Sequence, residues 1–204
     1  MAFTRRNELV RVEVSGLLLR AFQPTDTPDL LAAFADEDIA RWNPGPDGPE
    51  SAVAFMADRN DWSDALHASW AVADTSDRLM GSVSLHKIDP DQEDAEIGYW
   101  TAPWARRRGQ AARSVAAASR FAFTQLGLHR IYLYHAVENS GSCGVARVAG
   151  FVQEGTLRQS FRYADGVYHD EHLHGLLSSD VNAESGQAPA SPVRSGCGDG
   201  IREQ

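Results

Sequence analysis

The stretch from residue 95 to residue 137 constrains the fold most, because its hydrophobic pattern changes period twice. Residues 95–101 alternate as a strand does, and apolar side chains then recur at helical spacing up to a stop at Gly127. The β-branched and aromatic run RIYLYHAV follows at residues 130–137. A strand, a long helix and a second strand in this order predict a right-handed βαβ unit with two parallel strands.

Strand patterns with short turns flank this unit and predict antiparallel pairing. The other expected strands cover residues 9–22 (broken at Ser15-Gly16), 69–74, 79–88, 151–163 and 167–177 (the last two meeting at Asp165-Gly166). Further helices are expected at 27–40 with Thr27 as cap, at 50–66 and at 139–150. The predicted fold class is therefore α/β, with a mixed, mostly antiparallel twisted sheet, a central parallel βαβ unit and helices on both faces.

We expect one domain over residues 1–178. Residues 179–204 are rich in Ser, Gly, Ala, Pro and charge, with almost nothing to bury, and are expected to form a disordered C-terminal tail.

The charge of the chain limits its partners. A formal net charge of −9 at pH 7 argues against nucleic acid and anionic membranes as ligands and favours a cationic acceptor such as an amine. The sequence has no signal-peptide pattern and no apolar run long enough to cross a bilayer. Cys197 lies in a glycine-rich segment, so we expect no structural disulfide with Cys143 and a cytoplasmic location.

The segment PWARRRGQAARSV, residues 103–115, places three arginines before Gly109 at the start of the long helix. The first amides of a helix lack intrahelical acceptors and lie at the positive end of its dipole. Because glycine lets an anion approach the backbone, residues 108–112 are predicted to bind a pyrophosphate. The alternative is a solvated turn at Arg106–Arg108. The signatures of P-loop and dinucleotide-binding proteins are both absent from the sequence.

The motifs EIGYW, RRRGQA, a long helix, RIYLYHAVENSGS and GF occur in an order that resembles the GCN5-related N-acetyltransferases (GNAT). Arg106-x-x-Gly109-x-Ala111 is similar to the pyrophosphate signature of that superfamily. GLLLRAF, AEIGYW and Asn139-x-x-Ser142 resemble more narrowly the ribosomal-protein-alanine acetyltransferase (RimJ/RimL-like) branch. Arg113 departs from that branch, which usually has glutamate there.

The resemblance implies an acyl-CoA, with its pyrophosphate on the helix start and its pantetheine between the splayed strands at 95–101 and 130–137. The cofactor-binding residues that it implies are Tyr99, Trp100, Arg106, Arg107, Arg108, Gly109, Gln110, Ala111, Ala112, Asn139 and Ser142.

Acyl transfer to an amine needs a base for the acceptor and an acid for the departing thiolate. Glu96 is the expected base, and its alternative role is a strand-end carboxylate in an ion pair. The resemblance places Ser142 near the sulfur as the acid, with helix capping as its alternative role and Tyr134 as the second candidate. Asn139 fits an N-cap.

The acceptor side is expected to include Trp42, Trp62, His135 and Asp170, and packing between the first two helices is the alternative for the two tryptophans. His169, His172 and His174 look clustered, but a strand points His169 to the opposite face, so we expect no metal.

The resulting functional prediction is an acetyl-CoA-dependent N-acetyltransferase, an enzyme of the acyl-CoA-dependent N-acyltransferase class without a metal. The acceptor is a primary amine: a protein N-terminus, a polyamine, an amino acid or an antibiotic-like small molecule. A non-catalytic acyl-CoA-binding regulatory module is the alternative, and a homodimer is left open.

Overall fold

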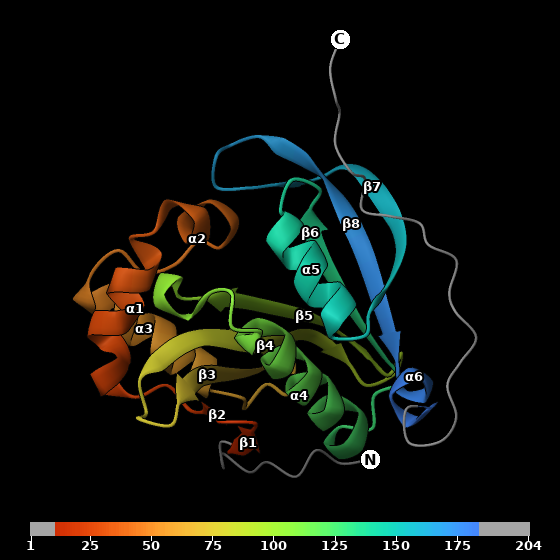
Figure 1. Cartoon of the computed structure of the whole chain (residues 1–204), viewed down its shortest axis with the longest axis horizontal. Coiled ribbons are helices and arrows are strands. Elements are labelled where there is room, and N and C mark those ends of the chain that lie inside the picture. The colour runs from red at the N-terminus through yellow and green to blue at the C-terminus, as the bar shows by residue number, and fades with distance from the viewer. Residues whose placement is uncertain (1–10, 184–204) are drawn as a thin grey trace.

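The computed structural model describes residues 11–183 and contains one eight-stranded sheet (Figure 1). In the sheet the strands follow the order β1-β2-β3-β4-β5-β6-β8-β7. The strands are β1 (Val12–Val14), β2 (Leu17–Arg20), β3 (Ala68–Asp74), β4 (Leu79–Asp89), β5 (Asp94–Thr101), β6 (Arg130–Ala136), β7 (Val152–Arg162) and β8 (Tyr168–Leu177). The helices are α1 (Thr27–Phe34), α2 (Glu37–Trp42), α3 (Pro49–Asn60), α4 (Gln110–Gln125), α5 (Ser140–Val148) and α6 (Ser178–Ala183), with short 3₁₀ turns at Pro24–Asp26 and Pro103–Ala105.

The predicted βαβ unit is confirmed as β5, α4 and β6. β5 and β6 are the parallel pair of this sheet, and the six other adjacent pairs are antiparallel. The pairing of β5 with β6 covers only residues 94–96 and 130–132. Beyond these residues the two strands diverge, which Figure 1 shows as β6 rises away from β5.

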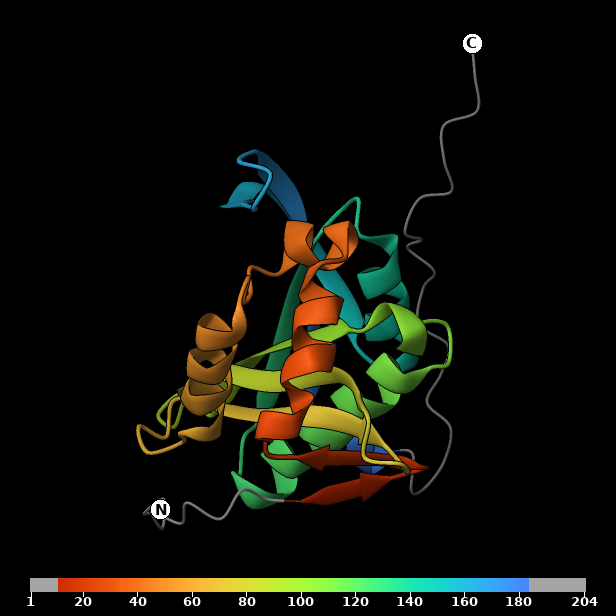
Figure 2. The ribbon, with the colours of Figure 1, turned by 90° about the vertical axis from the view of Figure 1, so that its left-hand side faces the viewer.

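Two apolar cores lie on opposite faces of the sheet, as the prediction of helices on both faces requires. Val115, Ala118 and Ala122 of α4 pack with one core, together with Trp70 of β3. The second core joins α1, α2 and α3 to the other face, with Phe34 at its centre. Figure 2 shows α1 and α3 in front of the sheet, on the side away from α4.

The predicted helix at 27–40 is wrong as a single element. It breaks at Asp36, whose side chain accepts a hydrogen bond from the Ile39 amide and caps α2. Thr27 is not the cap of α1; that position belongs to Asp26, which also pairs with buried Arg20 at 2.8 Å.

The boundaries differ at two other places. The helix expected at 50–66 ends at Asn60. The ordered domain extends past residue 178, because α6 follows β8 directly and Val181 packs against the α4-side core. The remainder of the expected tail, residues 184–204, lies outside the described residues. Within residues 11–183, no helix combines the length and apolarity that crossing a membrane requires.

Candidate active site

The loop before α4 has the geometry of an anion site. Gly109 is the N-cap residue and adopts φ +67°, a left-handed conformation that favours glycine. The first intrahelical hydrogen bond runs from the Arg113 amide to the Gly109 carbonyl, so the amides ahead of it have no acceptor within the helix. A Cβ at Gly109 would meet no atom within 4 Å, and the space above this backbone is therefore open.

Arg113, the departure from the family pattern, organises this loop. Its guanidinium donates to the carbonyl of Arg108 at 3.2 Å and to the carbonyl of Ser15 at 2.7 Å. By binding carbonyl oxygens it holds the loop against the β1–β2 turn and leaves the amide face uncovered.

The three predicted arginines do different things. Arg106 pairs with Asp36 and with Asp38 of α2, so its charge is already compensated. Arg107 and Arg108 are exposed and are the cations that remain beside the open amides.

A polar pair lies at the gap between β5 and β6. The hydroxyl of Tyr99 lies 2.6 Å from the Ser142 hydroxyl, and burial raises the pKa of Tyr99 well above its usual range against the opposing effect of that hydrogen bond. The Asn139 side chain accepts from the Ser142 amide at 3.1 Å, which confirms the predicted N-cap of α5. Ser142 therefore lies in the first turn of α5, and its hydroxyl pairs with Tyr99 rather than capping its own helix.

A cleft of about 190 Å³ opens on the other face of the sheet, between the strands and α1–α3. It is lined by Phe34, Trp42, Asn43, Pro44, Phe55, Arg59, Ser82, Ser84, His86, Gly98, Tyr99 and Trp100. Tyr99 and Trp100, both predicted as cofactor residues, thus line the place where the gap meets the cleft. Gln110 and Ala111 line a smaller hollow with the same two residues, and Ala112 is buried on α4.

His86 is the titratable group that sequence reasoning missed. Burial is the main cause that lowers the pKa of His86, the charge of Arg59 adds to this, and Glu96 works in the opposite direction. His86 pairs with Glu96 across β4 and β5, so the two side chains share the cleft face of the sheet. His86 could have been identified only by its position opposite Glu96 in the antiparallel pairing of β4 with β5. The register of that pairing cannot be read from the sequence of either strand.

Glu96 itself is held by a cation. Lys87 donates to its carboxylate at 2.7 Å, where β4 has a bulge and Lys87 adopts φ +49°. Tyr134 lies on the same face of β6 as Tyr132, which pairs with Glu96. It is therefore on the face opposite to α5 and to Ser142.

Arg59 is the cation in the cleft. Its guanidinium carbon lies 3.7 Å from the centroid of the Phe55 ring, and its ion pair with exposed Asp58 is long, at 3.4 Å. Burial is the main cause that lowers the pKa of Arg59 from its usual value, which still leaves it protonated at neutral pH. The planar donor group is thus oriented by stacking on Phe55, and Nη1 is the nitrogen that it shares with Asp58.

The predicted acceptor residues separate into two groups. Trp42 lines the cleft and packs against Tyr163 with ring centroids 5.0 Å apart. Trp62 does not: it packs on Trp70, on the α4 side of the sheet. It thus packs in the α4-side core and not between the first two helices, which was the alternative considered from the sequence.

His135 and Asp170 also lie away from the cleft. His135 is buried on the α5 side of β6. Asp170 lies between residues of β8 that face the cleft side, so its own side chain is on the opposite face of the sheet, where it accepts a hydrogen bond from the Gln159 amide. Its neighbours His169 and Glu171 are on the cleft side of the sheet, and both contact Tyr163. Successive residues of a strand face opposite sides of the sheet, so a shift of one residue exchanges the two faces.

Cys143 contradicts the expectation of no disulfide, since its sulfur is disulfide-bonded in the structure. The other cysteine of the chain, Cys197, lies outside the described residues.

Comparisons with known proteins agree with this geometry. The family model described as acetyltransferase (GNAT) domain matches residues 16–152. YdaF of Bacillus subtilis, provisionally named a ribosomal N-acetyltransferase, is 28% identical over 175 residues, which cover 82% of this chain and 94% of the relative.

Two solved structures show the same fold. Spermidine N-acetyltransferase from Vibrio cholerae in complex with CoA and spermine is 27% identical with a TM-score of 0.69, over 81% of this chain and 97% of that one. Ribosomal-protein-S5-alanine acetyltransferase from Vibrio fischeri is 22% identical with a TM-score of 0.72, over 84% of this chain and 98% of that one.

Proposed function

We propose, from the premise that this chain belongs to the acetyltransferase (GNAT) family, that it acetylates the α-amine of a peptide or protein N-terminus. The family and its relatives make the chain an acyl-CoA-dependent N-acetyltransferase rather than a non-catalytic binding module. The acetyl donor is acetyl-CoA, and the residue roles and the acceptor class that follow are our proposal.

The donor approaches from the α4 side. Its pyrophosphate binds the amides at residues 108–112, with Arg107 and Arg108 adding charge. Its pantetheine lies in the gap beyond Glu96 and Tyr132, where the two strands have unpaired backbone groups. Support for this placement comes from the open space above Gly109 and from the end of the β5–β6 pairing.

The gap joins this donor side to the cleft on the other face. Ser142 and Tyr99 lie at the junction, so a thioester that reached them would present its carbonyl to the cleft. The departing thiolate then takes the proton of the Ser142 hydroxyl, Tyr99 passes its own proton to Ser142, and solvent returns a proton to Tyr99.

We assign the base to His86 and an electrostatic role to Glu96, the base expected from sequence. His86 lines the cleft and is neutral at pH 7, so its imidazole can accept the proton of an ammonium directly or through water. Glu96 stabilises the resulting imidazolium from the neighbouring strand while Lys87 holds it in place. Tyr134 remains a prediction for the acid, although Ser142 is better placed.

Arg59 is the single observation that carries the acceptor class. A polyamine brings a second cation, which Arg59 would repel in the half-buried cleft. A peptide N-terminus instead brings carbonyl oxygens next to its amine, and a stacked guanidinium is suited to bind them. The aromatic wall of Phe34, Phe55 and Trp42 can hold an apolar first side chain.

The test compares acceptors at equal concentration by release of free CoA. Short peptides with a free α-amine should be acetylated with a kcat/KM at least tenfold above that for spermidine, and α-acetylated peptides should be inert. Arg59→Gln should reduce kcat/KM for peptides by more than tenfold and narrow this preference. A preference for spermidine over peptides in both the wild-type chain and Arg59→Gln would contradict the proposal.

A matched control separates the charge of Arg59 from its shape. Arg59→Lys keeps the charge but loses the planar donor fork, so it should behave like Arg59→Gln with peptides and still reject spermidine. Arg41→Gln, in a cation that lies over Trp42 but outside the cleft lining, should change neither ratio.

Oligomeric state and location stay predictions. β7 is one of the two outer strands of the sheet and exposes Leu157 and Phe161, a surface that a second copy could cover in a homodimer. Light scattering of the wild-type chain and of Phe161→Ser decides between monomer and dimer. Cell fractionation tests the cytoplasmic location.

A further inference from the structure

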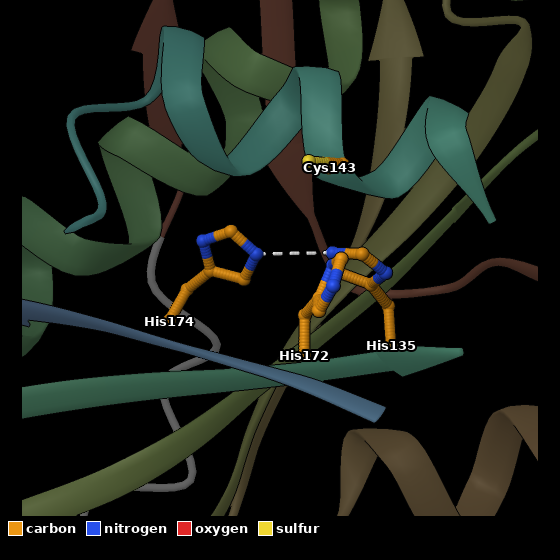
Figure 3. Close-up of side chains that lie close together, drawn as sticks. All are labelled: His135, Cys143, His172 and His174. Atoms are coloured by element: carbon orange, nitrogen blue, oxygen red, sulfur yellow. Dashed lines mark hydrogen bonds between the residues drawn. The ribbon is translucent and has the colours of Figure 1, made fainter. Parts of the chain in front are cut away.

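Three histidines meet beneath α5, away from the cleft. His135 of β6 pairs in register with His172 of β8, and Leu133 pairs with His174, so all three imidazoles emerge from one face of the sheet. His135 and His174 are 3% and 2% exposed, and His172 is half-buried. Figure 3 shows the three rings directed toward one another below the helix.

We infer that His135, His172 and His174 form a binding site for a divalent transition-metal ion such as Zn²⁺. The proposal is independent of the acetyl transfer described above, and none of the three residues has a role in it.

The spacing of the nitrogens suits such an ion. The Nε2 atoms of His135 and His174 lie 3.0 Å apart, and one donor atom of each histidine lies within 4.8 Å of those of the other two. Nitrogen ligands at about 2.0–2.1 Å from a tetrahedral ion lie roughly 3.3 Å from one another. Small rotations of the His172 ring would therefore complete the set.

The hydrogen bonds prepare His135 as a ligand. Its Nδ1 lies 2.8 Å from the Ala136 carbonyl, and because a carbonyl only accepts, Nδ1 carries the hydrogen. Nε2 then keeps its lone pair toward the other two rings. A ligating histidine that donates its second nitrogen to a backbone carbonyl is the usual arrangement around protein-bound metals.

One remaining nitrogen points to a missing partner. Nδ1 of His172 is buried without a hydrogen-bond partner and is the nitrogen that this ring would offer the ion, whereas His174 would bind through Nε2, the atom that faces His135. Buried polar atoms are nearly always satisfied, and apolar side chains would fill this place without that cost. Each imidazole can bind the ion as a neutral ring with its proton on the other nitrogen, so binding needs no buried charge on the ligands.

Three protein ligands leave one coordination position for water. Cys143 lies above the rings on α5, but its sulfur is disulfide-bonded and is not counted as a ligand. The ion would join β6 to β8 in the half of β6 that no longer pairs with β5. We therefore expect it to stabilise the fold next to the glycine-rich helix α5.

The test uses the full chain without a histidine tag, freed of metal with a chelator that is then removed. Calorimetric titration with Zn²⁺ should show one ion per chain with micromolar or tighter affinity, and the melting temperature should rise by several degrees in excess Zn²⁺. His172→Asn and His174→Asn should each weaken binding more than tenfold. His129→Asn, in an exposed histidine, should leave it unchanged.

Folding and ligand identity have their own controls. If His174→Asn does not fold, half-buried His172 still provides the measurement, with circular dichroism confirming the metal-free fold. Cys143→Ser should retain binding. The inference is overturned if the wild-type chain binds no stoichiometric Zn²⁺, if the histidine variants bind like His129→Asn, or if Cys143→Ser abolishes binding.

Discussion

Replacing Gly109 by glutamate tests the donor site most directly. Because φ at this residue is +67°, any Cβ there carries a backbone cost of about 1–2 kcal/mol, although it would meet no atom within 4 Å. The structure therefore predicts a folded protein with a melting temperature lower by several degrees. Acetyl-CoA should nevertheless bind much more weakly, since the side chain enters the space proposed for the pyrophosphate.

The size of that loss follows from charge. Two like unit charges about 4 Å apart repel by about 1 kcal/mol in water and about 4 kcal/mol near a protein surface. Affinity for acetyl-CoA should then fall more than tenfold, since about 1.4 kcal/mol corresponds to a factor of ten. Isothermal titration with acetyl-CoA measures it.

Gly127 supplies the matched control. It ends α4 with φ +71° and equally open space, so Gly127→Glu carries the same backbone cost at the opposite end of the helix. Its affinity for acetyl-CoA should match that of the wild-type chain. Equal affinities of the two variants would refute the placement of the pyrophosphate.

Four further predictions concern protons and stability. Ser142→Ala should lower kcat at least tenfold with little change in the Kd for acetyl-CoA, as single-turnover kinetics and titration can separate. The lowered pKa of His86 keeps it unprotonated to below about pH 6.5, so kcat/KM should fall only below that pH. Glu96→Gln removes an interaction that raises the pKa of His86, so the pH below which kcat/KM falls should become lower still. A loss of activity at every pH would instead identify Glu96 as the base. Asp36→Ala should cost about 1 kcal/mol of stability at pH 7 by urea unfolding. Burial tends to raise the pKa of Asp36, but its hydrogen bond from Arg106 lowers this pKa overall. The ionised carboxylate therefore stabilises the folded state fully above the ordinary carboxyl pKa, and this stabilisation is lost as the pH falls through the lowered pKa of the folded state.

Local patterns predicted the elements that depend on local physics. Helical periodicity with a stop at Gly127 identified α4, and the pair Asp165-Gly166 identified the turn of the last hairpin. Asn139 was recognisable as a cap because the first amides of any helix need acceptors. The break at Asp36 was missed although its cap is local, since Asp36 accepts from the Ile39 amide; the ion pair of the same side chain with Arg106, far along the chain, could not be read from the local pattern.

The sequence by itself thus determined the βαβ unit, the glycine at the start of α4 and the family to which they belong. Only the tertiary structure decided which side chains share a face across strands. Alternation placed His172 and His174 together, but the register of β8 against β6 brought His135 to them, and the register of β4 against β5 brought His86 to Glu96. Side-chain alternation is a property of one strand, whereas register is set by the packing of the whole sheet.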